Sequence, residues 1–188
     1  MAGKRIAVYS GSFNPLHIGH LAIIRHILEV AGFDMVYLVV SPKNPLKDSI
    51  SSDSADSRIK AAREAVARHF SEGVKVDDIE TGMPEPHYTI RTLKALQERE
   101  PENTFTLVIG ADNLASMRRW REYSLILKDF GVAVFPRSGF DLEAISKDLM
   151  EEDSEYRISI LNAEMVDISS TIIREAIASG QDVSSWLM

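Results

Sequence analysis

The sequence contains no cysteine among its 188 residues, so it can form neither a disulfide framework nor a thiol nucleophile. It has no apolar run of roughly eighteen residues, and Lys4 and Arg5 lead directly into a short strand-like segment rather than into a signal peptide's hydrophobic region. Basic residues number 21 against 28 acidic ones, and the net charge of -7 disfavours binding to nucleic acid or to an anionic membrane. We therefore expect a soluble, cytoplasmic protein with no nucleic-acid or membrane partner.

What the sequence does contain is an alternation of short apolar runs with segments of helical apolar spacing. Hydrophobic residues make up 45% of the chain, which is enough for a substantial core. The predicted strands are 5–10, 35–40, 74–76, 105–109 and 131–135, with short candidates at 158–161 and 165–166. We expect a single α/β domain over residues 1–188 with a doubly wound, mostly parallel sheet and the active site at the carboxyl ends of its strands.

The connection after the first predicted strand carries the strongest functional signal. Gly11 and Gly19 allow a close approach of backbone or ligand atoms, and Asn14–Pro15 favours a tight turn. His17 and His20 are three residues apart at the start of a predicted helix, so both can point to one place. The free N–H groups and the helix dipole favour an anion there, which predicts a phosphate site with two imidazoles.

Two other interpretations of the histidine pair are weaker. A pair of surface histidines would not explain why the glycines and the Asn-Pro turn fall at the same strand-helix junction. A metal site would need a third ligand, and the chain offers neither cysteine nor a second histidine-rich segment.

A second anion site is predicted near the end of the chain. Ser169, Ser170 and Thr171 precede an apolar pattern that ends at Gly180, as is typical of a capped helix. Arg174 lies one turn after Ser170, so its guanidinium shares a face with the hydroxyls of the first turn.

Further candidates stand at strand ends and helix starts. Lys47 follows the second strand, where α/β sheets bind ligands, and we favour a ligand role for it. Asp112 follows the fourth strand and could accept hydrogen bonds from sugar hydroxyls or cap the next helix. Thr89 is expected to be a helix N-cap. Trp120 has helical spacing typical of core packing, but its arginine neighbours favour an exposed ring that stacks on a ligand.

Taken together, the stretch 11–20 with its His-Ile-Gly-His core and the stretch 168–174 resemble the paired signatures of the nucleotidyltransferase superfamily of adenylyltransferases. The stretches 41–47, 88–93 and 110–120 resemble bacterial nicotinate mononucleotide adenylyltransferases in order and spacing. The resemblance covers nearly the whole chain and implies a Rossmann-like fold. It also implies transfer of AMP from ATP to nicotinate mononucleotide, which yields deamido-NAD and pyrophosphate in NAD biosynthesis.

The resemblance also implies roles for individual residues. The catalytic residues would be His17, His20 and Arg174. The residues at ATP would be Gly11, Ser12, Phe13, His17, Gly19, His20, Ser169, Ser170, Thr171 and Arg174. The residues at the mononucleotide would be Lys47, Tyr88, Thr89, Asp112 and Trp120. Mg²⁺ would accompany ATP, held by phosphates and water rather than by side chains.

Several alternatives stay open at this point. The acceptor could be nicotinamide mononucleotide or another small phosphate-bearing molecule, and the chain could form a homo-oligomer. Phosphopantetheine is disfavoured as the acceptor by the length of the chain and by Tyr88, Thr89 and Trp120. A non-catalytic nucleotide-binding protein is disfavoured because both histidines and Arg174 are present. His-Ile-Gly-His also occurs in class I aminoacyl-tRNA synthetases, but a lysine-rich second motif and an RNA-binding module are missing.

Overall fold

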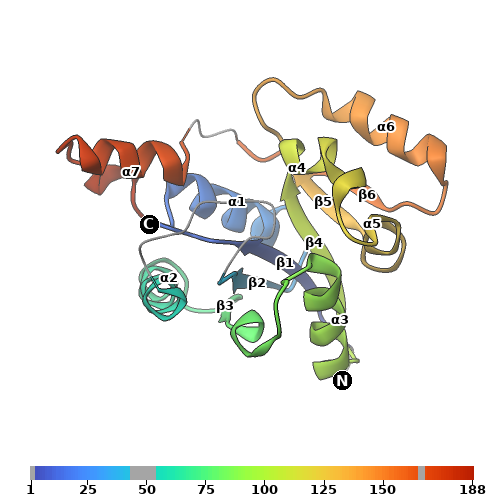
Figure 1. Ribbon diagram of the computed structural model, residues 1–188, viewed down its shortest axis with the longest axis horizontal. Helices are drawn as coiled ribbons and strands as arrows, with labels where there is room; N and C mark the ends of the chain where they lie inside the picture. Colours follow the sequence, from blue (N-terminus) through green and yellow to red (C-terminus); the bar gives the residue numbers. More distant parts are fainter. Residues whose placement is uncertain (1–2, 43–53, 165–167) are drawn as a thin grey trace.

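The computed structural model describes residues 3–42, 54–164 and 168–188, and within them six strands form one sheet. The strand order is β3-β2-β1-β4-β5-β6, and every neighbouring pair is parallel (Figure 1). The strands are β1 Arg5–Gly11, β2 Met35–Val40, β3 Val74–Asp77, β4 Thr104–Gly110, β5 Val132–Phe135 and β6 Ile158–Ile160. The strand candidate at 165–166 lies outside the described residues. The predicted doubly wound, Rossmann-like α/β fold is confirmed, with a sheet that is parallel throughout its described strands.

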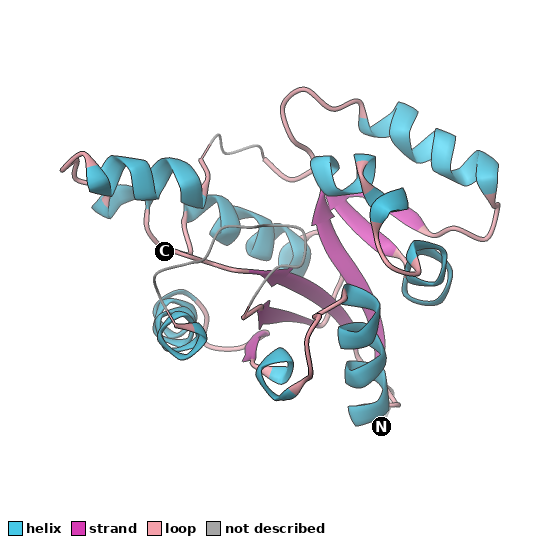
Figure 2. Ribbon diagram, in the orientation of Figure 1, coloured by secondary structure: helices cyan, strands magenta, loops and turns pink. Residues whose placement is uncertain are grey.

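Helices flank the sheet on both sides (Figure 2). The α-helices are α1 Ile18–Glu29, α2 Ala55–His69, α3 Thr89–Arg99, α4 Ala111–Ala115, α5 Tyr123–Leu125, α6 Leu142–Glu152 and α7 Ser170–Ala178. Short 3₁₀ turns are η1 Ile79–Gly82, η2 Met117–Arg119 and η4 Ser184–Trp186, and η3 Ile126–Phe130 is a π-helical turn. None of the helices in the described ranges is both long and apolar enough to cross a membrane.

One local expectation is wrong. Tyr88 rather than Thr89 is the N-cap of α3, and no side chain caps that helix, so Thr89 is simply its first residue. The helical spacing at Trp120 spans two elements, because α4 ends at Ala115 and the η2 turn follows. Helical spacing alone cannot separate an α-helix from a short α-helix followed by a 3₁₀ turn.

The continuous apolar run of β1 is explained by burial on both faces. Ala7 and Tyr9 pack into the core that α1 and α2 cover. Ile6 and Val8 point the other way, into the core that α3, α4 and α6 cover. The two helices that follow the central strands β1 and β4 therefore lie on opposite faces of the sheet. In doubly wound sheets such a switch of faces, here at the carboxyl ends of β1 and β4, marks the usual ligand site.

Candidate active site

The loop between β1 and α1 is held in shape by its own aromatic ring. Phe13 has a positive φ of 45°, an uncommon backbone conformation for a residue with a side chain, and its ring is buried. A Cβ on Gly11 would lie 3.1 Å from that ring, and a Cβ on Gly19 would lie 3.0 Å from Nδ1 of His17. A side chain at either glycine would therefore require the facing ring to shift slightly.

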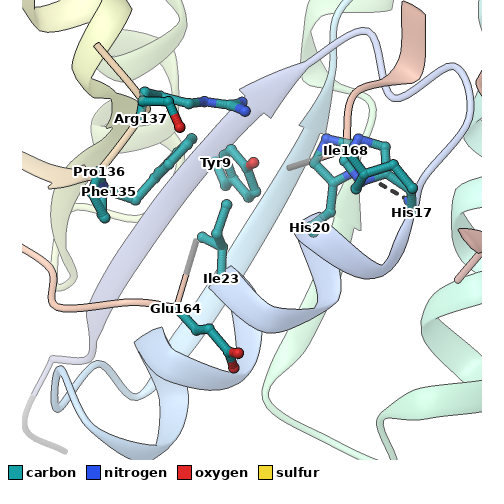
Figure 3. Close-up of a pocket in the computed structure, with 11 residues that line it drawn as sticks. Tyr9, His17, His20, Ile23, Phe135, Pro136, Arg137, Glu164 and Ile168 are labelled. Atoms are coloured by element: carbon teal, nitrogen blue, oxygen red, sulfur yellow. Dashed lines mark hydrogen bonds between the residues drawn. The ribbon is translucent and has the colours of Figure 1, made fainter. Parts of the chain in front are cut away.

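The two histidines stack at the entrance to α1, with ring centroids 3.6 Å apart (Figure 3). His17 is the N-cap residue, and its backbone N–H donates a hydrogen bond to Nδ1 of His20 at 3.1 Å. Because Nδ1 of His20 accepts, a neutral His20 carries its proton on Nε2. His20 can therefore donate a hydrogen bond from Nε2 while its other nitrogen holds the helix start in place.

Both imidazoles are electrically neutral near pH 7. Burial, and then the charge of Arg137, lower the pKa of His17 to about 4. Burial, the neighbouring His17 and Arg137 hold the pKa of His20 well below its ordinary value. The histidines therefore offer N–H donors, and the positive charge of the site comes from arginine side chains and helix N-termini.

An NMR titration of the ligand-free protein should show this neutrality directly. We expect the ring of His17 to titrate near pH 4. In urea-unfolded protein the histidines should titrate at pH values of about 6.5. Because its folded pKa is the lower one, the stabilisation from neutral His17 is present above the unfolded value and is lost as the pH falls from there toward 4. A midpoint near 6.5 in the folded protein would contradict the neutral-donor assignment.

The residues at the end of β5 are part of the site although no sequence motif indicated them. Phe135 and Arg137 lie on one side of Tyr9, and His17 and His20 lie on the other (Figure 3). These four residues and Tyr9 line one pocket. The ring centroid of Tyr9 lies 5.9 Å from that of Phe135 and 6.0 Å from that of His20. The guanidinium of Arg137 lies over the Phe135 ring, 5.1 Å from its centroid. Its position in the sequence could have indicated Arg137, because it follows the carboxyl end of a predicted strand, where α/β sheets bind ligands.

The predicted second anion site lies against the first one. Ser169 caps α7 by accepting a hydrogen bond from the Ile172 N–H at 3.2 Å, as expected. The hydroxyl of Ser170 donates to the carbonyl of Pro15 at 3.0 Å. Arg174 donates to the carbonyl of Asn14 at 2.8 Å and to the Thr171 hydroxyl at 3.0 Å. Residues up to 160 positions apart in the sequence thereby form one polar surface.

Residues 187 and 188 contact the loop between β1 and α1. Leu187 pairs with His17 in an isolated antiparallel bridge, and the Met188 N–H donates to the Leu16 carbonyl at 3.3 Å. Ile18, at the start of α1, packs against the apolar side of α7. The loop between β1 and α1, residues 12–17, is called the histidine loop below. It is therefore held between the sheet and the C-terminal segment.

Asp112 stands at the edge of this arrangement. It lies in the first turn of α4 with about half of its side chain exposed, and Oδ1 is 3.9 Å from Nε of Arg137. A Cβ on Gly110 would lie 2.5 Å from that same carboxylate oxygen, so a larger residue there would require the half-exposed Asp112 side chain to move. Asp112 does not cap α4 with a side-chain hydrogen bond, so the capping alternative is wrong.

Three predicted mononucleotide residues lie outside the histidine pocket. Tyr88 and Trp120 are partly buried against the core that α3 and α4 cover, and Thr89 is half-buried at the start of α3. The indole N–H of Trp120 is buried, and no residue of the described ranges accepts a hydrogen bond from it. Lys47 lies outside the residues that the structure describes.

The basic surroundings expected for Trp120 are largely neutralised. Arg118 forms ion pairs with Asp148, at 2.7 Å, and with Glu152, both on α6. Arg121 lies 3.8 Å from a carboxylate oxygen of Glu122. Arg118 thus fastens α6 to this part of the chain and Arg121 faces a neighbouring carboxylate, whereas Arg119 is exposed.

No cluster of three or more metal-ligating side chains is found in the part of the chain that the structure describes. Apart from Glu164, which also lines the pocket, the charged and N–H-donating groups around it are suited to an anion. Two helix N-termini, the N–H donors of the imidazoles, Arg137 and Arg174 surround the carboxyl end of β1. A parallel doubly wound sheet with these groups at its central crevice defines the class of α/β nucleotide-binding proteins.

The family follows from comparison with known proteins. The model of the cytidylyltransferase-like family matches residues 8–176, and the chain belongs to that family. It is 36% identical over 183 residues to a probable nicotinate-nucleotide adenylyltransferase of Flavobacterium johnsoniae, covering 97% of this chain and 91% of the relative. It is 35% identical over 187 residues to a probable nicotinate-nucleotide adenylyltransferase of Bacteroides fragilis, covering 100% of this chain and 89% of that one.

Solved structures share the fold. The nicotinic acid mononucleotide adenylyltransferase of Plasmodium falciparum complexed with NaAD superposes with a TM-score of 0.79 at 20% identity, covering 98% of this chain and 90% of the other. A putative nicotinate-nucleotide adenylyltransferase of Vibrio parahaemolyticus gives a TM-score of 0.66 at 22% identity, covering 98% and 87%.

Proposed function

We propose that this protein transfers the adenylyl group of ATP to the 5′-phosphate of nicotinate mononucleotide, forming deamido-NAD and pyrophosphate. The observation that carries the proposal is the convergence of the two anion sites, in which Arg174 on α7 donates to the Asn14 carbonyl of the histidine loop. The curated relatives, which carry this activity in their names at about a third identity, support it.

The reaction needs alignment more than covalent help. An oxygen of the mononucleotide phosphate attacks the α-phosphorus of ATP, the bond to the β-phosphate oxygen breaks, and pyrophosphate leaves. The attacking phosphate is already ionised at pH 7 and needs no general base. What remains is to hold the two phosphates in line and to stabilise the negative charge that gathers on the leaving pyrophosphate.

Each group of the site has a part in that task. His17 and His20 donate hydrogen bonds to the ATP phosphates in their neutral forms, next to the N-terminus of α1. Ser169, Ser170, Thr171 and Arg174 bind the β- and γ-phosphates at the N-terminus of α7. Mg²⁺ enters with ATP and is held by phosphate oxygens and water.

The mononucleotide occupies the other side of the crevice in this proposal. Asp112 accepts hydrogen bonds from its ribose hydroxyls, and Lys47 meets its phosphate. The pyridine ring lies beside Tyr88, Thr89 and Trp120, where the buried indole N–H can reach the carboxylate on that ring. A carboxylate would accept a stronger hydrogen bond there than a carboxamide would, which favours nicotinate as the substrate.

The test is pyrophosphate release from Mg²⁺-ATP with nicotinate mononucleotide, measured in parallel with nicotinamide mononucleotide. Turnover with the acid well above that with the amide is expected. A preference for the amide would assign the sister activity. Absence of turnover with both, with ATP still bound, would mean that the protein is a nucleotide-binding protein without this catalysis.

Replacing Trp120 tests the pyridine subsite. Trp120→Phe removes the N–H but keeps a ring, and we expect the KM for nicotinate mononucleotide to rise by about tenfold because one hydrogen bond to a charged group is lost. The KM for ATP should not change. Tyr123→Phe, a neighbouring aromatic that packs against the same core, is the matched control. An unchanged KM for the mononucleotide with a lowered melting temperature would assign Trp120 to the core alone.

A further inference from the structure

Arg58 is buried, and it has no role in the predicted motifs or in the proposed reaction. It lies in the first turns of α2, and only 4% of the residue is exposed. Arginine is among the residues least often buried, because its charge must be compensated by hydrogen bonds. Its neighbour on the same helix, Arg63, shows the ordinary behaviour, with more than half of its side chain exposed and a surface ion pair to Asp78.

The guanidinium of Arg58 joins the ends of two neighbouring strands. Nη1 donates to the carbonyl of Ser12 at 2.7 Å and to the carbonyl of Ser41 at 2.9 Å. Nη2 donates to the carbonyl of Pro42 at 3.0 Å. Ser12 belongs to the histidine loop after β1, and Ser41 and Pro42 follow β2 directly. One planar side chain thus clamps both loops at the carboxyl edge of the sheet.

The hydrogen bond to Ser12 also fixes the direction of the next amide. In a planar trans peptide, the carbonyl and the N–H of the same unit point in opposite directions. With the Ser12 carbonyl held on Arg58, the N–H of Phe13 points away from α2. Phe13 is the residue with the positive φ of 45°, a conformation that persists only when the surroundings hold it. Its buried ring is one such support, and Arg58 is the second.

We propose that Arg58 is a positioning residue of the nucleotide site, which turns the Ser12–Phe13 peptide so that the Phe13 N–H donates to a phosphate of ATP. The proposal rests on the proposed function only in taking ATP as the ligand. It requires no particular acceptor, because the effect is on the binding of ATP and not on the choice of mononucleotide.

The first test is the substitution Arg58→Lys, with Arg63→Lys as the matched control on the same helix. Lysine keeps the charge but lacks the planar fork that serves carbonyls from two loops. In calorimetric titrations with Mg²⁺-ATP below the melting temperature, we expect the Kd of Arg58→Lys to rise by about tenfold or more, the loss of one hydrogen bond to a charged group. Arg63→Lys should bind as the unaltered protein does.

The outcomes separate positioning from a structural role. If folded Arg58→Lys melts at a lower temperature yet binds Mg²⁺-ATP with unchanged affinity, Arg58 serves only stability and the proposal is overturned. Failure of the unaltered protein to bind ATP would overturn it as well. Failure to release pyrophosphate with either mononucleotide, with ATP still bound, would instead refute the proposed function and leave this inference standing on the binding data.

A second measurement needs no substitution at Arg58, and so it holds even if Arg58→Lys does not fold. The chain has seven phenylalanines, so selective ¹⁵N-Phe labelling gives a simple amide spectrum in which Phe13→Leu identifies the Phe13 signal. Addition of Mg²⁺-ATP should move the Phe13 amide proton downfield, as a new hydrogen bond to phosphate requires. The amide of Phe105, inside β4, should stay in place. A Phe13 signal that does not respond to saturating ATP would overturn the proposal.

Discussion

The substitution His20→Asn is expected to lower kcat by about 10²-fold to 10³-fold, the loss usual for one preorganised donor at a developing negative charge. Asparagine places an acceptor oxygen near the position of Nδ1, so the hydrogen bond from the His17 N–H can be kept. What it cannot replace is the Nε2–H donor. The start of α1 should therefore keep its structure while the stabilisation of the leaving pyrophosphate is lost.

Steady-state pyrophosphate release and thermal melting measure the two consequences separately. His69→Asn is the matched control, because His69 lies exposed at the end of α2 and away from the pocket. The control should keep the activity of the unaltered protein. If His20→Asn turned over normally, His20 would have no part in the chemistry, and its conformational role at the helix start would be its whole function.

The substitution Arg174→Ala is expected to lower kcat by about 10²-fold, again the scale of one lost transition-state donor. Two effects combine in it. The exposed guanidinium next to the N-terminus of α7 no longer offers charge to the departing phosphates. The tie between α7 and the Asn14 carbonyl is also lost, so the two anion sites are less firmly held together.

Arg174→Lys and Arg25→Ala separate these effects from a general change of charge. Lysine retains the charge but not the two-pronged contact with Asn14 and Thr171, so an activity between the alanine variant and the unaltered protein is expected. Arg25 is exposed on α1, and its removal changes the net charge by the same amount. A loss of kcat in Arg25→Ala equal to that in Arg174→Ala would mean that long-range charge, and not the contact, carries the effect.

The fold could be predicted because parallel strands buried on both faces leave an unmistakable pattern. The runs around Val8 and Leu38 are apolar throughout, and each stands beside a helix pattern of different period. Thr89 is a position where local sequence is not sufficient. A threonine before an apolar pattern is typical of an N-cap. Which residue is the N-cap depends on how the preceding loop enters the helix, however, and in α3 the N-cap is Tyr88.

The candidate site was predictable where chemistry and local structure coincide within a few residues. Glycine, Asn-Pro and two histidines at one strand-helix junction indicate an anion site without any knowledge of the rest of the chain. The serines before Ile172 and the cap that they predict also follow from local preferences, and the structure confirms the cap at Ser169. The neutrality of the histidines could not be read in this way, since it comes from burial and from Arg137.

The sequence by itself thus determined the α/β class, the alternation of strands and helices along the chain, and the two polar helix starts that are predicted to be anion sites, because these depend on interactions between residues near one another in the chain. Only the tertiary structure decided that the two helix starts meet, that Arg137 faces the histidines and that Arg58 clamps the loops after β1 and β2. Those contacts join residues from separate elements, and burial, charge and hydrogen-bond geometry there are set by packing across the sheet edge rather than by local sequence.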